Sequence, residues 1–533
     1  METNFAWKDR TLGNLVATRA RELGDKTFLY FRDQEISYKE FDRKSNTVAN
    51  NLQRMGIGKG DKVAIMMPNC PEWYYVWLGL AKIGAIEVPL NTAYRGDLLG
   101  YQIDQSDSRW VVIQDQLVDR LGIIQENLSK VERVVVHSES GSVPSINLSQ
   151  AITHLGELLE GSTEYAYAEV KPSDIYAIQY TSGTTGASKG SMTPHAFAFA
   201  FIPVHLRACG YTSSDVLYTC LPLFHGNPQV LTTIVAMVAG AKVALGEHFH
   251  ATTFWDEMRK YGATAFNYIG GILNMLYKQP ESPKDRDHSV RVAFGAAAPA
   301  NLWTAIEERF GFQIVEGFGL TESGAILCNF GPNRKAGSLG KPHEIYDVAI
   351  FGDDDQPAAP NEIGEIVGKP RIPYAMTQGY YKMPDKSLET FRNFWFHTGD
   401  LGYYDEQGYY FFVDRKKDAI RRRGENISSF EVEKVINANP KVLESAALAH
   451  PSEMGEDEVR VAVILKEGQT MTPLELVQWC EERMAYFMVP RFVEFRTSFP
   501  KTPTDRVEKY KLRQEGLPPD HWDREKAGYK LKR

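Results

Sequence analysis

Residues 180–190 of the chain read Tyr-Thr-Ser-Gly-Thr-Thr-Gly-Ala-Ser-Lys-Gly and close the apolar run Ile175–Tyr180. Three glycines, five serine or threonine hydroxyls and one lysine supply the N–H groups, hydroxyls and charge that surround phosphate oxygens. The order Lys189-Gly190-Ser191 does not fit the Walker A pattern, so an ordinary P-loop nucleoside triphosphatase is excluded. A glycine- and serine-rich surface loop is the general alternative for this composition. The order of the residues favours a phosphate-binding loop of another kind.

Short apolar runs alternate with helical patterns on both sides of this loop. Val63–Met67 and Ile86–Leu90 are predicted strands, and Pro71–Ile83 is the helix predicted between them. Such alternation predicts an α/β fold in which mainly parallel sheets are layered with helices. The aromatic residues in that helix have helical spacing and are interpreted as core: Trp73, Tyr74, Tyr75 and Trp77. Further strands are predicted at Val216–Thr219, Lys242–Leu245, Thr264–Asn267 and Arg291–Phe294.

The domain organisation follows from length and from a change of pattern. A chain of 533 residues is too long for one core. Beyond Gly364 the strands become shorter, and Tyr409–Val413 precedes the charged run Asp414-Arg415-Lys416-Lys417-Asp418. Such a run is usually a solvated face. Here we interpret residues 414–417 as a hinge between a large N-terminal domain, residues 1–413, and a small mobile α+β domain, residues 418–533.

Composition narrows the class of protein. The net charge of −8 and the pI near 5.9 argue against nucleic acid as a partner. No apolar run approaches the length of a membrane span, so no stable membrane insertion is expected. The five cysteines are scattered without metal-binding spacing, and the start of the chain has no secretory signal. We therefore expect a cytoplasmic enzyme, with a homodimer among the oligomeric states left open.

The loop resembles the signature of the adenylate-forming superfamily, which contains acyl-CoA synthetases, luciferases and the adenylation domains of peptide synthetases. Four further motifs occur in the family's order, and the resemblance spans residues from about 10 to about 515. It implies that ATP phosphates are bound by Lys189 and by the loop residues Thr181, Ser182, Gly183, Thr184, Thr185 and Gly186. It also implies Mg²⁺ ligation by Thr184 and Glu322, which agrees with the preference of Mg²⁺ for oxygen ligands beside substrate phosphates.

Further motifs extend the predicted site. Phe224-His225 resembles the motif at the carboxylate end of the acyl pocket; a lone histidine is more often structural, but this context favours function. The small residues Gly295, Ala296 and Ala297 follow a predicted strand and let a flat ring approach the backbone closely. The resemblance assigns adenine and phosphate contacts to the motif Glu316, Gly317, Phe318, Gly319 and Thr321. In this motif Phe318 stacks on adenine. From position alone, we expect His225, Gly226, Asn227, Tyr268 and Ala297 to line the acyl pocket.

The C-terminal motifs add the ribose, hinge and CoA positions. Asp400 and Arg415 match the residues that reach the ribose hydroxyls, and a carboxylate suits a diol. Lys417 matches the hinge residue. The loop Arg423, Gly424 and Glu425 resembles the segment that lines the CoA channel after the small domain rotates.

One departure from the family pattern lies near the C-terminus. The family has Pro-Lys-Thr-x-x-Gly-Lys, whereas residues 500–506 read Pro-Lys-Thr-Pro-Thr-Asp-Arg, so Arg506 stands at the catalytic lysine. Arginine keeps the charge but is planar and larger, so the exchange is not conservative. Either Arg506 replaces the lysine, or adenylation is weakened.

The resemblance therefore implies an ATP-dependent carboxylic acid:CoA ligase that forms an acyl-adenylate. Residues 423–428, the Pro-Leu-Phe-His-Gly-Asn segment and Trp522-Asp523-Arg524 resemble the crotonobetaine/carnitine-CoA ligase branch. The acid stays open among carnitine-like, short- or medium-chain and aromatic acids. The alternatives are an adenylating amide synthetase, a carrier-protein-loading enzyme, and a non-catalytic nucleotide-binding protein, the last because of Arg506. Luciferase activity is disfavoured, and a dehydrogenase lacks its dinucleotide fingerprint.

Overall fold

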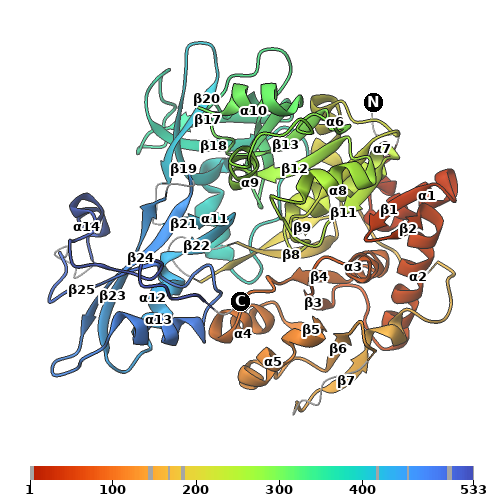
Figure 1. The fold of residues 1–533 in the computed structure, drawn as a ribbon. Coiled ribbons are helices and arrows are strands. Elements are labelled where there is room, and N and C mark those ends of the chain that lie inside the picture. Colours follow the sequence, from red (N-terminus) through yellow and green to blue (C-terminus); the bar gives the residue numbers. More distant parts are fainter. Residues whose placement is uncertain are drawn as a thin grey trace. The chain divides into compact units, whose positions relative to one another are not determined.

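A computed structural model of the chain describes residues 5–141, 148–165, 168–181, 187–415, 419–452, 455–500 and 507–531 (Figure 1). The chain divides into two compact units. The large unit contains Met1–Thr92, Ile103–Tyr180 and Gly190–Asp414, and the small unit contains Ala93–Gln102, Thr181–Lys189 and Arg415–Arg533. Lys417, the predicted hinge residue, lies outside the described residues, so its role stays a prediction.

A seven-stranded sheet forms one layer of the large unit, in the order β7-β6-β5-β3-β4-β8-β9. The strand pairs from β7 to β8 are parallel, so their carboxyl ends lie at one edge (Figure 1). Parallel strands with buried faces account for the apolar runs that predicted them. The strands are β3 (Lys62–Met66), β4 (Ile86–Pro89), β5 (Ser108–Gln114), β6 (Arg133–His137), β7 (Ala151–His154), β8 (Ile175–Thr181) and β9 (Lys189–Pro194).

Helices α2 (Tyr38–Arg54) and α3 (Pro71–Ile83) pack against each other in this unit. Helix α3 has the predicted bounds, because Pro71 occupies its first turn and Gly84 ends it in the left-handed conformation, with φ 72°. Its four clustered aromatic side chains are buried, which confirms their interpretation as core: Trp73, Tyr74, Tyr75 and Trp77.

A nine-stranded sheet has the order β16-β15-β14-β13-β12-β10-β11-β1-β2. Its central strands are parallel and its outer pairs antiparallel. This mixed α/β architecture confirms the predicted fold class. The strands are β1 (Thr27–Phe31), β2 (Gln34–Ser37), β10 (Val216–Thr219), β11 (Lys242–Leu245), β12 (Ala265–Ile269), β13 (Val292–Ala296), β14 (Gln313–Leu320), β15 (Gly324–Asn329) and β16 (Lys341–Pro342).

The remaining helices of the large unit connect or cover these strands. The apolar helix α6 and the π-helix η5 that follows β10 contribute buried side chains to the core. The remaining helices are α1 (Leu12–Leu23), α5 (Asp119–Ile123), α6 (Ala196–Cys209), η5 (Asn227–Ile234), α7 (Val235–Ala239), α8 (Phe254–Tyr261), α9 (Gly270–Tyr277), α10 (Trp303–Phe310) and α11 (Pro384–Thr390). Helix α4 (Gly96–Gln105) is divided between the two units.

A four-stranded sheet completes the large unit, in the order β17-β18-β19-β20, with β17 (Tyr346–Phe351), β18 (Gly364–Pro370), β19 (Phe396–Tyr404) and β20 (Tyr410–Arg415). Its core includes Ile366 and Phe396, and Phe318 of β14 packs against the same cluster. Strand β20 extends into the predicted hinge residues 414–417, two residues further than the apolar pattern indicated.

The small unit holds a hairpin, β21 (Ala419–Arg422) with β22 (Glu425–Ser428), and a four-stranded sheet. Helices α12 and α13 contribute to its apolar core. The elements are β23 (Val442–Pro451), β24 (Asp457–Leu465), β25 (Phe492–Phe495), β26 (Trp522–Asp523), α12 (Ser429–Asn437), α13 (Pro473–Glu481) and α14 (Lys509–Glu515).

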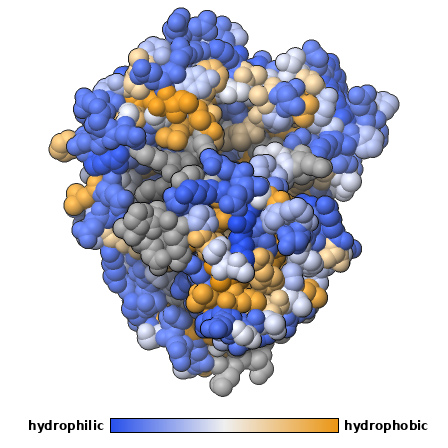
Figure 2. All heavy atoms as spheres, turned by 90° about the vertical axis from the view of Figure 1, so that its left-hand side faces the viewer, coloured by the Kyte–Doolittle hydropathy of each residue, from blue (hydrophilic) through white to orange (hydrophobic). Residues whose placement is uncertain are grey.

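Polar residues cover much of the face drawn in Figure 2, and apolar residues appear there in separate patches. Within the described ranges, no helix is both long enough and apolar enough to cross a membrane.

Candidate functional site

The two ends of the predicted phosphate loop lie on neighbouring strands. Strand β8 ends at Thr181 and β9 begins at Lys189, and these strands are adjacent in the seven-stranded sheet. The Thr181 hydroxyl donates to the Lys189 carbonyl oxygen at 3.5 Å. The two described ends of the predicted loop, Thr181 and Lys189, therefore lie close together. Residues Ser182, Gly183, Thr184, Thr185 and Gly186 lie outside the described residues.

The two predicted adenine motifs are brought together by β13 and β14. Gly295 pairs with Glu316 across the parallel ladder, and Ala296 and Ala297 follow at the carboxyl end of β13. The Glu316 carboxylate accepts hydrogen bonds from the Ala298 N–H at 2.6 Å and the Tyr268 hydroxyl at 3.4 Å. Glu316 therefore fastens three segments to one another.

Glycine is required in this arrangement for a steric reason. A Cβ at Gly295 would lie 2.2 Å from the Tyr268 carbonyl oxygen, and one at Gly319 would lie 1.7 Å from the Gly324 carbonyl oxygen. Gly317 and Phe318 lie in β14, which extends through Leu320 because β15 pairs with this part of the motif. The apolar run 312–315 alone did not predict that extension.

Glu322, the predicted Mg²⁺ ligand, is buried in the turn that includes Thr321 and precedes β15. Its carboxylate accepts a hydrogen bond from the Tyr380 hydroxyl at 2.7 Å, and its carbonyl oxygen accepts one from the Thr377 N–H at 2.8 Å. Tyr380 forms a bridge with Ser191 of β9. The predicted metal ligand is thus fastened to the strand that follows the phosphate loop.

The loop that carries His225 is anchored from two directions. The side-chain amide of Asn267, on β12, donates to the side-chain oxygen Oδ1 of Asn227 at 2.6 Å. The Gln179 side chain of β8 lies beside Gly226. His225 is half-buried, and its ring lies 4.6 Å from that of Phe224. The strand that enters the phosphate loop and the His225 loop are therefore neighbours.

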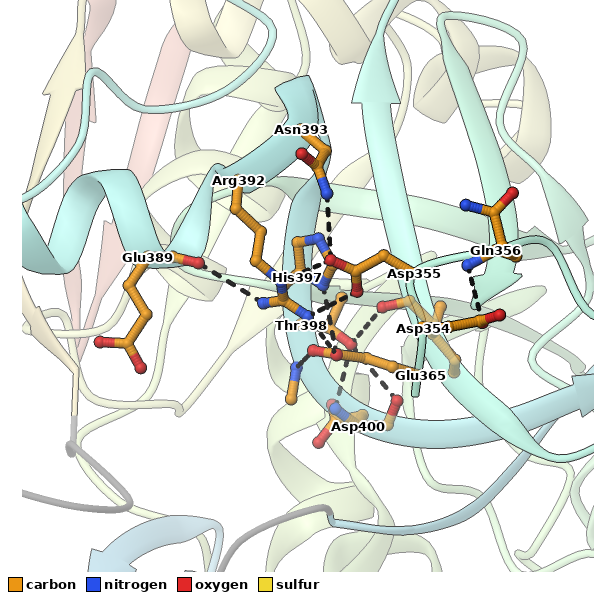
Figure 3. Close-up of polar contacts among 12 residues, drawn as sticks. Asp354, Asp355, Gln356, Glu365, Glu389, Arg392, Asn393, His397, Thr398 and Asp400 are labelled. Atoms are coloured by element: carbon orange, nitrogen blue, oxygen red, sulfur yellow. Dashed lines mark hydrogen bonds and ion pairs between the residues drawn. The ribbon is translucent and has the colours of Figure 1, made fainter. Parts of the chain in front are cut away.

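Asp400, the predicted ribose acceptor, is buried in β19 within a charged network (Figure 3). The Asp400 N–H donates to the Thr398 hydroxyl at 3.1 Å, and the Gly399 N–H donates to the Glu365 carboxylate at 2.9 Å. The same Glu365 carboxylate pairs with Arg392 at 3.3 Å and with His397 at 3.2 Å. Glu365 fixes the backbone turn that presents Asp400.

A small cavity, with a volume of about 10 Å³, adjoins the motifs on β13 and β14. That is about the space one water molecule requires. Its lining includes side chains directly beside the predicted motifs and others from α6 and η5: Phe201, His205, Leu231, Phe294, Glu316 and His343. The five residues expected from position to line the acyl pocket do not belong to this lining.

The cavity has an unusual balance of charge. Burial lowers the pKa of His205 to about 3 and that of His343 to about 4, so both imidazoles are neutral at pH 7. Burial raises the pKa of the Glu316 carboxyl to about 7. Nε2 of His205 has no hydrogen-bond partner in the part of the chain that the structure describes. The cavity therefore offers aromatic rings, neutral imidazoles and one carboxyl that can carry negative charge.

In the small unit, Arg423 and Gly424 form the two-residue turn between β21 and β22. Both have positive φ, 55° and 79°, as a type I′ hairpin turn requires. Their N–H groups donate to the Glu456 carboxylate, that of Gly424 at 3.2 Å. Glu425 begins β22. Arg415 ends β20, while its side chain and the whole of Arg506 lie outside the described residues.

Sequence reasoning did not identify Tyr380, Glu365 or His205. Tyr380 is 58 residues from Glu322, and Glu365 is 34 residues from Gly399. His205 directly follows the most apolar stretch of the chain, Ala196–Val204, and no motif there indicated a function. An isolated histidine beside that stretch was the one available signal for it.

Comparisons with known proteins agree with the resemblance seen in the sequence. The model of the AMP-binding enzyme family matches residues 16–381, and that of the AMP-binding enzyme C-terminal domain matches residues 431–506. A crotonobetaine/carnitine–CoA ligase from Salmonella typhi is 33% identical over 510 residues, which cover 92% of this chain and 96% of that protein.

Solved structures give the same result for the fold. A fatty acyl CoA synthetase from Mycobacterium tuberculosis has 27% identity and a TM-score of 0.69, with 96% of this chain and 99% of that chain covered. A double mutant of o-succinylbenzoate CoA synthetase from Bacillus subtilis has 23% identity and a TM-score of 0.81, with 94% and 98% covered. The predicted family resemblance is confirmed.

Proposed function

Because the chain belongs to the adenylate-forming acyl-CoA ligases of the AMP-binding enzyme family, we propose that it activates a short carboxylic acid bearing a quaternary ammonium group. The carboxylate attacks the α-phosphorus of ATP and releases pyrophosphate. The thiol of CoA then attacks the acyl-adenylate carbonyl and releases AMP. The cavity that adjoins the motifs on β13 and β14 is the observation that supports this choice of acid.

The position and size of the cavity favour a short acyl chain. Phe294 directly precedes Gly295, Glu316 begins the predicted adenine motif, and Leu231 follows the His225 loop in η5. In this proposal the tail of the acid enters this cavity, whose lining includes none of the five residues expected from position to line the acyl pocket. A volume of about 10 Å³ means that the tail must displace side chains on entry, and this cost rises with chain length.

The charge of the cavity favours a cationic tail. The neutral rings of His205 and His343 do not repel a cation, and ionised Glu316 attracts one. Phe201 and Phe294 add aromatic rings, whose faces attract quaternary ammonium groups. The relatives at 33% identity, whose names specify crotonobetaine and carnitine, support the same class of acid.

We assign the remaining roles from the motifs. Lys189 and the loop residues bind the ATP phosphates, Phe318 stacks on adenine, and Asp400 accepts hydrogen bonds from the ribose hydroxyls. The buried Glu322 carboxylate, oriented by Tyr380, is the oxygen donor that fits Mg²⁺, which would neutralise phosphate charge when bound. Arg506 supplies the charge of the usual lysine during adenylation, and Lys417 serves as the hinge.

Cytoplasmic location and a homodimeric state complete the proposal. Cell fractionation tests the first, and size-exclusion chromatography with light scattering tests the second.

Pyrophosphate release from Mg·ATP tests the proposed acid. The panel pairs crotonobetaine and carnitine with acids in which carbon replaces the quaternary nitrogen, and adds a long-chain fatty acid and an aromatic acid, each with and without CoA. We expect release with the ammonium acids, stimulated by CoA, and at least about tenfold lower kcat/KM with the carbon isosteres. Equal rates with the isosteres, or a preference for the fatty or aromatic acid, would exclude the cationic acid.

A further inference from the structure

A second cluster of reactive side chains lies at the edge of the seven-stranded sheet. Cys70 Sγ, a Glu72 carboxylate oxygen and a His137 ring nitrogen all lie within 4.8 Å of one another. Cys70 is buried, and the other two residues are half-buried. We propose that Cys70, Glu72 and His137 form a binding site for Zn²⁺, separate from the Mg²⁺ site predicted at Glu322.

The parallel topology builds this cluster. Strands β3, β5 and β6 are neighbours with parallel pairing, so their carboxyl ends meet at one edge. His137 is the last residue of β6. After β3 the chain turns into α3, whose N-cap is Cys70 in extended conformation and whose first turn carries Glu72. Side chains at the carboxyl ends of parallel strands commonly face one ligand.

The adjacent strands add two more candidate donors near the cluster. Asp115 follows β5, between the ends of β3 and β6, and its charge acts on His137. His154 ends β7, where its Nδ1 accepts a hydrogen bond from the Gly156 N–H at 3.0 Å. Its Nε2 is buried and has no hydrogen-bond partner among the described residues. Neither side chain belongs to the group of ligand atoms that lie within 4.8 Å of one another, so the fourth ligand in this proposal is water.

The donor set selects zinc among the common cations. Mg²⁺ and Ca²⁺ prefer oxygen donors alone, whereas a thiolate, an imidazole and a carboxylate together suit Zn²⁺. Ligand atoms around a tetrahedral zinc lie about 3.5 Å apart, given bond lengths of about 2.0–2.3 Å. Closing from separations of up to 4.8 Å requires movements of about 1 Å, which half-buried side chains can make. Binding replaces the thiol proton, which is released to solvent.

The site is connected to the His225 loop through the residue next to Cys70. The Asn69 side chain donates to the carbonyl oxygens of Leu221 at 3.1 Å and Gly246 at 2.9 Å, and it accepts from the Leu223 N–H at 2.9 Å. Zinc at Cys70 would fix the backbone beside Asn69. We therefore expect zinc to stabilise the large unit, whichever acid the enzyme uses.

Cobalt substitution tests the site directly, because Co²⁺ takes zinc's position and is coloured. Metal-free protein is titrated with Co²⁺ in the near-ultraviolet and visible ranges, and then with Zn²⁺ in competition. One equivalent of Co²⁺ should produce thiolate-to-cobalt charge-transfer absorption, and Zn²⁺ should abolish it. Cys70→Ala should remove this absorption, while the matched control Cys480→Ala, whose thiol lies in the small unit, should retain it.

A second variant keeps the test valid if the buried Cys70 position does not tolerate alanine. His137→Gln changes a half-buried side chain and should weaken Zn²⁺ binding by more than about a hundredfold, since even indirect partners of a metal contribute about 10–100-fold. Zinc should also raise the thermal midpoint of the native protein but not of this variant. Absence of thiolate absorption, or unchanged zinc affinity in His137→Gln, would overturn the proposal. Neither readout depends on catalytic activity.

Discussion

Replacing Glu316 with glutamine separates the charge of the cavity from its shape. Glutamine keeps the size of the side chain and an oxygen that accepts from the Ala298 N–H, bonded at 2.6 Å in the native protein. It removes the negative charge and replaces the other carboxylate oxygen with an amide NH2 group. Two unit charges about 6 Å apart interact by about 2.8 kcal/mol at an effective dielectric of about 20, so Glu316→Gln should lower kcat/KM for an ammonium acid by about ten- to a hundredfold.

The charge of Glu316 depends on pH, and this dependence predicts in which direction the preference for the ammonium acid changes. Burial raises the pKa of Glu316 to about 7, so the carboxyl is mostly protonated at pH 6 and mostly ionised at pH 8. The ratio of kcat/KM for an ammonium acid to that for its carbon isostere should therefore rise between pH 6 and pH 8. In Glu316→Gln the ratio should be low and independent of pH.

Pyrophosphate release measured with both acids across this pH range distinguishes the effect of the Glu316 charge from a structural effect of the side chain. The carbon isostere is the internal control, because it experiences the same pocket without the charge. If Glu316→Gln lowers kcat/KM equally for the two acids, the residue acts only by holding Ala298 and Tyr268 in place. If the ratio still rises with pH in the variant, another group attracts the cation.

Three further predictions concern other parts of the large unit and the C-terminal arginine. Burial lowers the pKa of His205 to about 3, so the folded protein leaves this ring neutral as the pH falls from 7 to 5. In the unfolded chain the same ring takes up a proton over this range, which lowers the free energy of unfolding by about 2 kcal/mol. In His205→Gln, the fall in the free energy of unfolding between pH 7 and pH 5, measured with urea, should be smaller than in the native protein by about the same amount. A fall as large as that of the native protein would contradict this prediction. Glu365→Gln should loosen the turn before Asp400 and raise KM for ATP about tenfold without changing the ratio between the two acids; an unchanged KM would remove Glu365 from this role. Arg506→Ala should lose adenylate formation while preformed acyl-adenylate still reacts with CoA, and equal loss of both steps would refute the assignment.

The sequence predicted the elements whose ends carry residues that favour the start or the end of a helix, such as proline and glycine. Helix α3 was predicted with its observed bounds because Pro71 favours its first turn and Gly84 ends it without steric cost. The burial of Trp73 and Trp77 followed from helical spacing. Gly295 and Glu316, which were predicted from their motifs, lie on the neighbouring parallel strands β13 and β14.

Elements stabilised by distant partners could not be predicted in this way. The apolar run ended near Val315, yet β14 continues to Leu320 because β15 supplies antiparallel hydrogen bonds to glycine-rich residues. Tyr380 orients Glu322 across 58 residues of sequence. His205 was hidden in an apolar helix, since its role depends on the cavity that several elements enclose. Sequence motifs therefore predicted the candidate ligand-binding residues but not the residues that position them.

Transfer of oxygen from the acid to AMP is the most direct test of the account. Crotonobetaine labelled with heavy oxygen in its carboxylate is incubated with Mg·ATP, CoA and the enzyme, and the AMP is examined by mass spectrometry. Attack of the carboxylate on the α-phosphorus leaves one carboxylate oxygen on AMP when CoA displaces it, so we expect AMP carrying one heavy oxygen, in amounts equal to the acyl-CoA formed. Unlabelled AMP, or labelled inorganic phosphate formed together with ADP, would contradict the adenylate pathway.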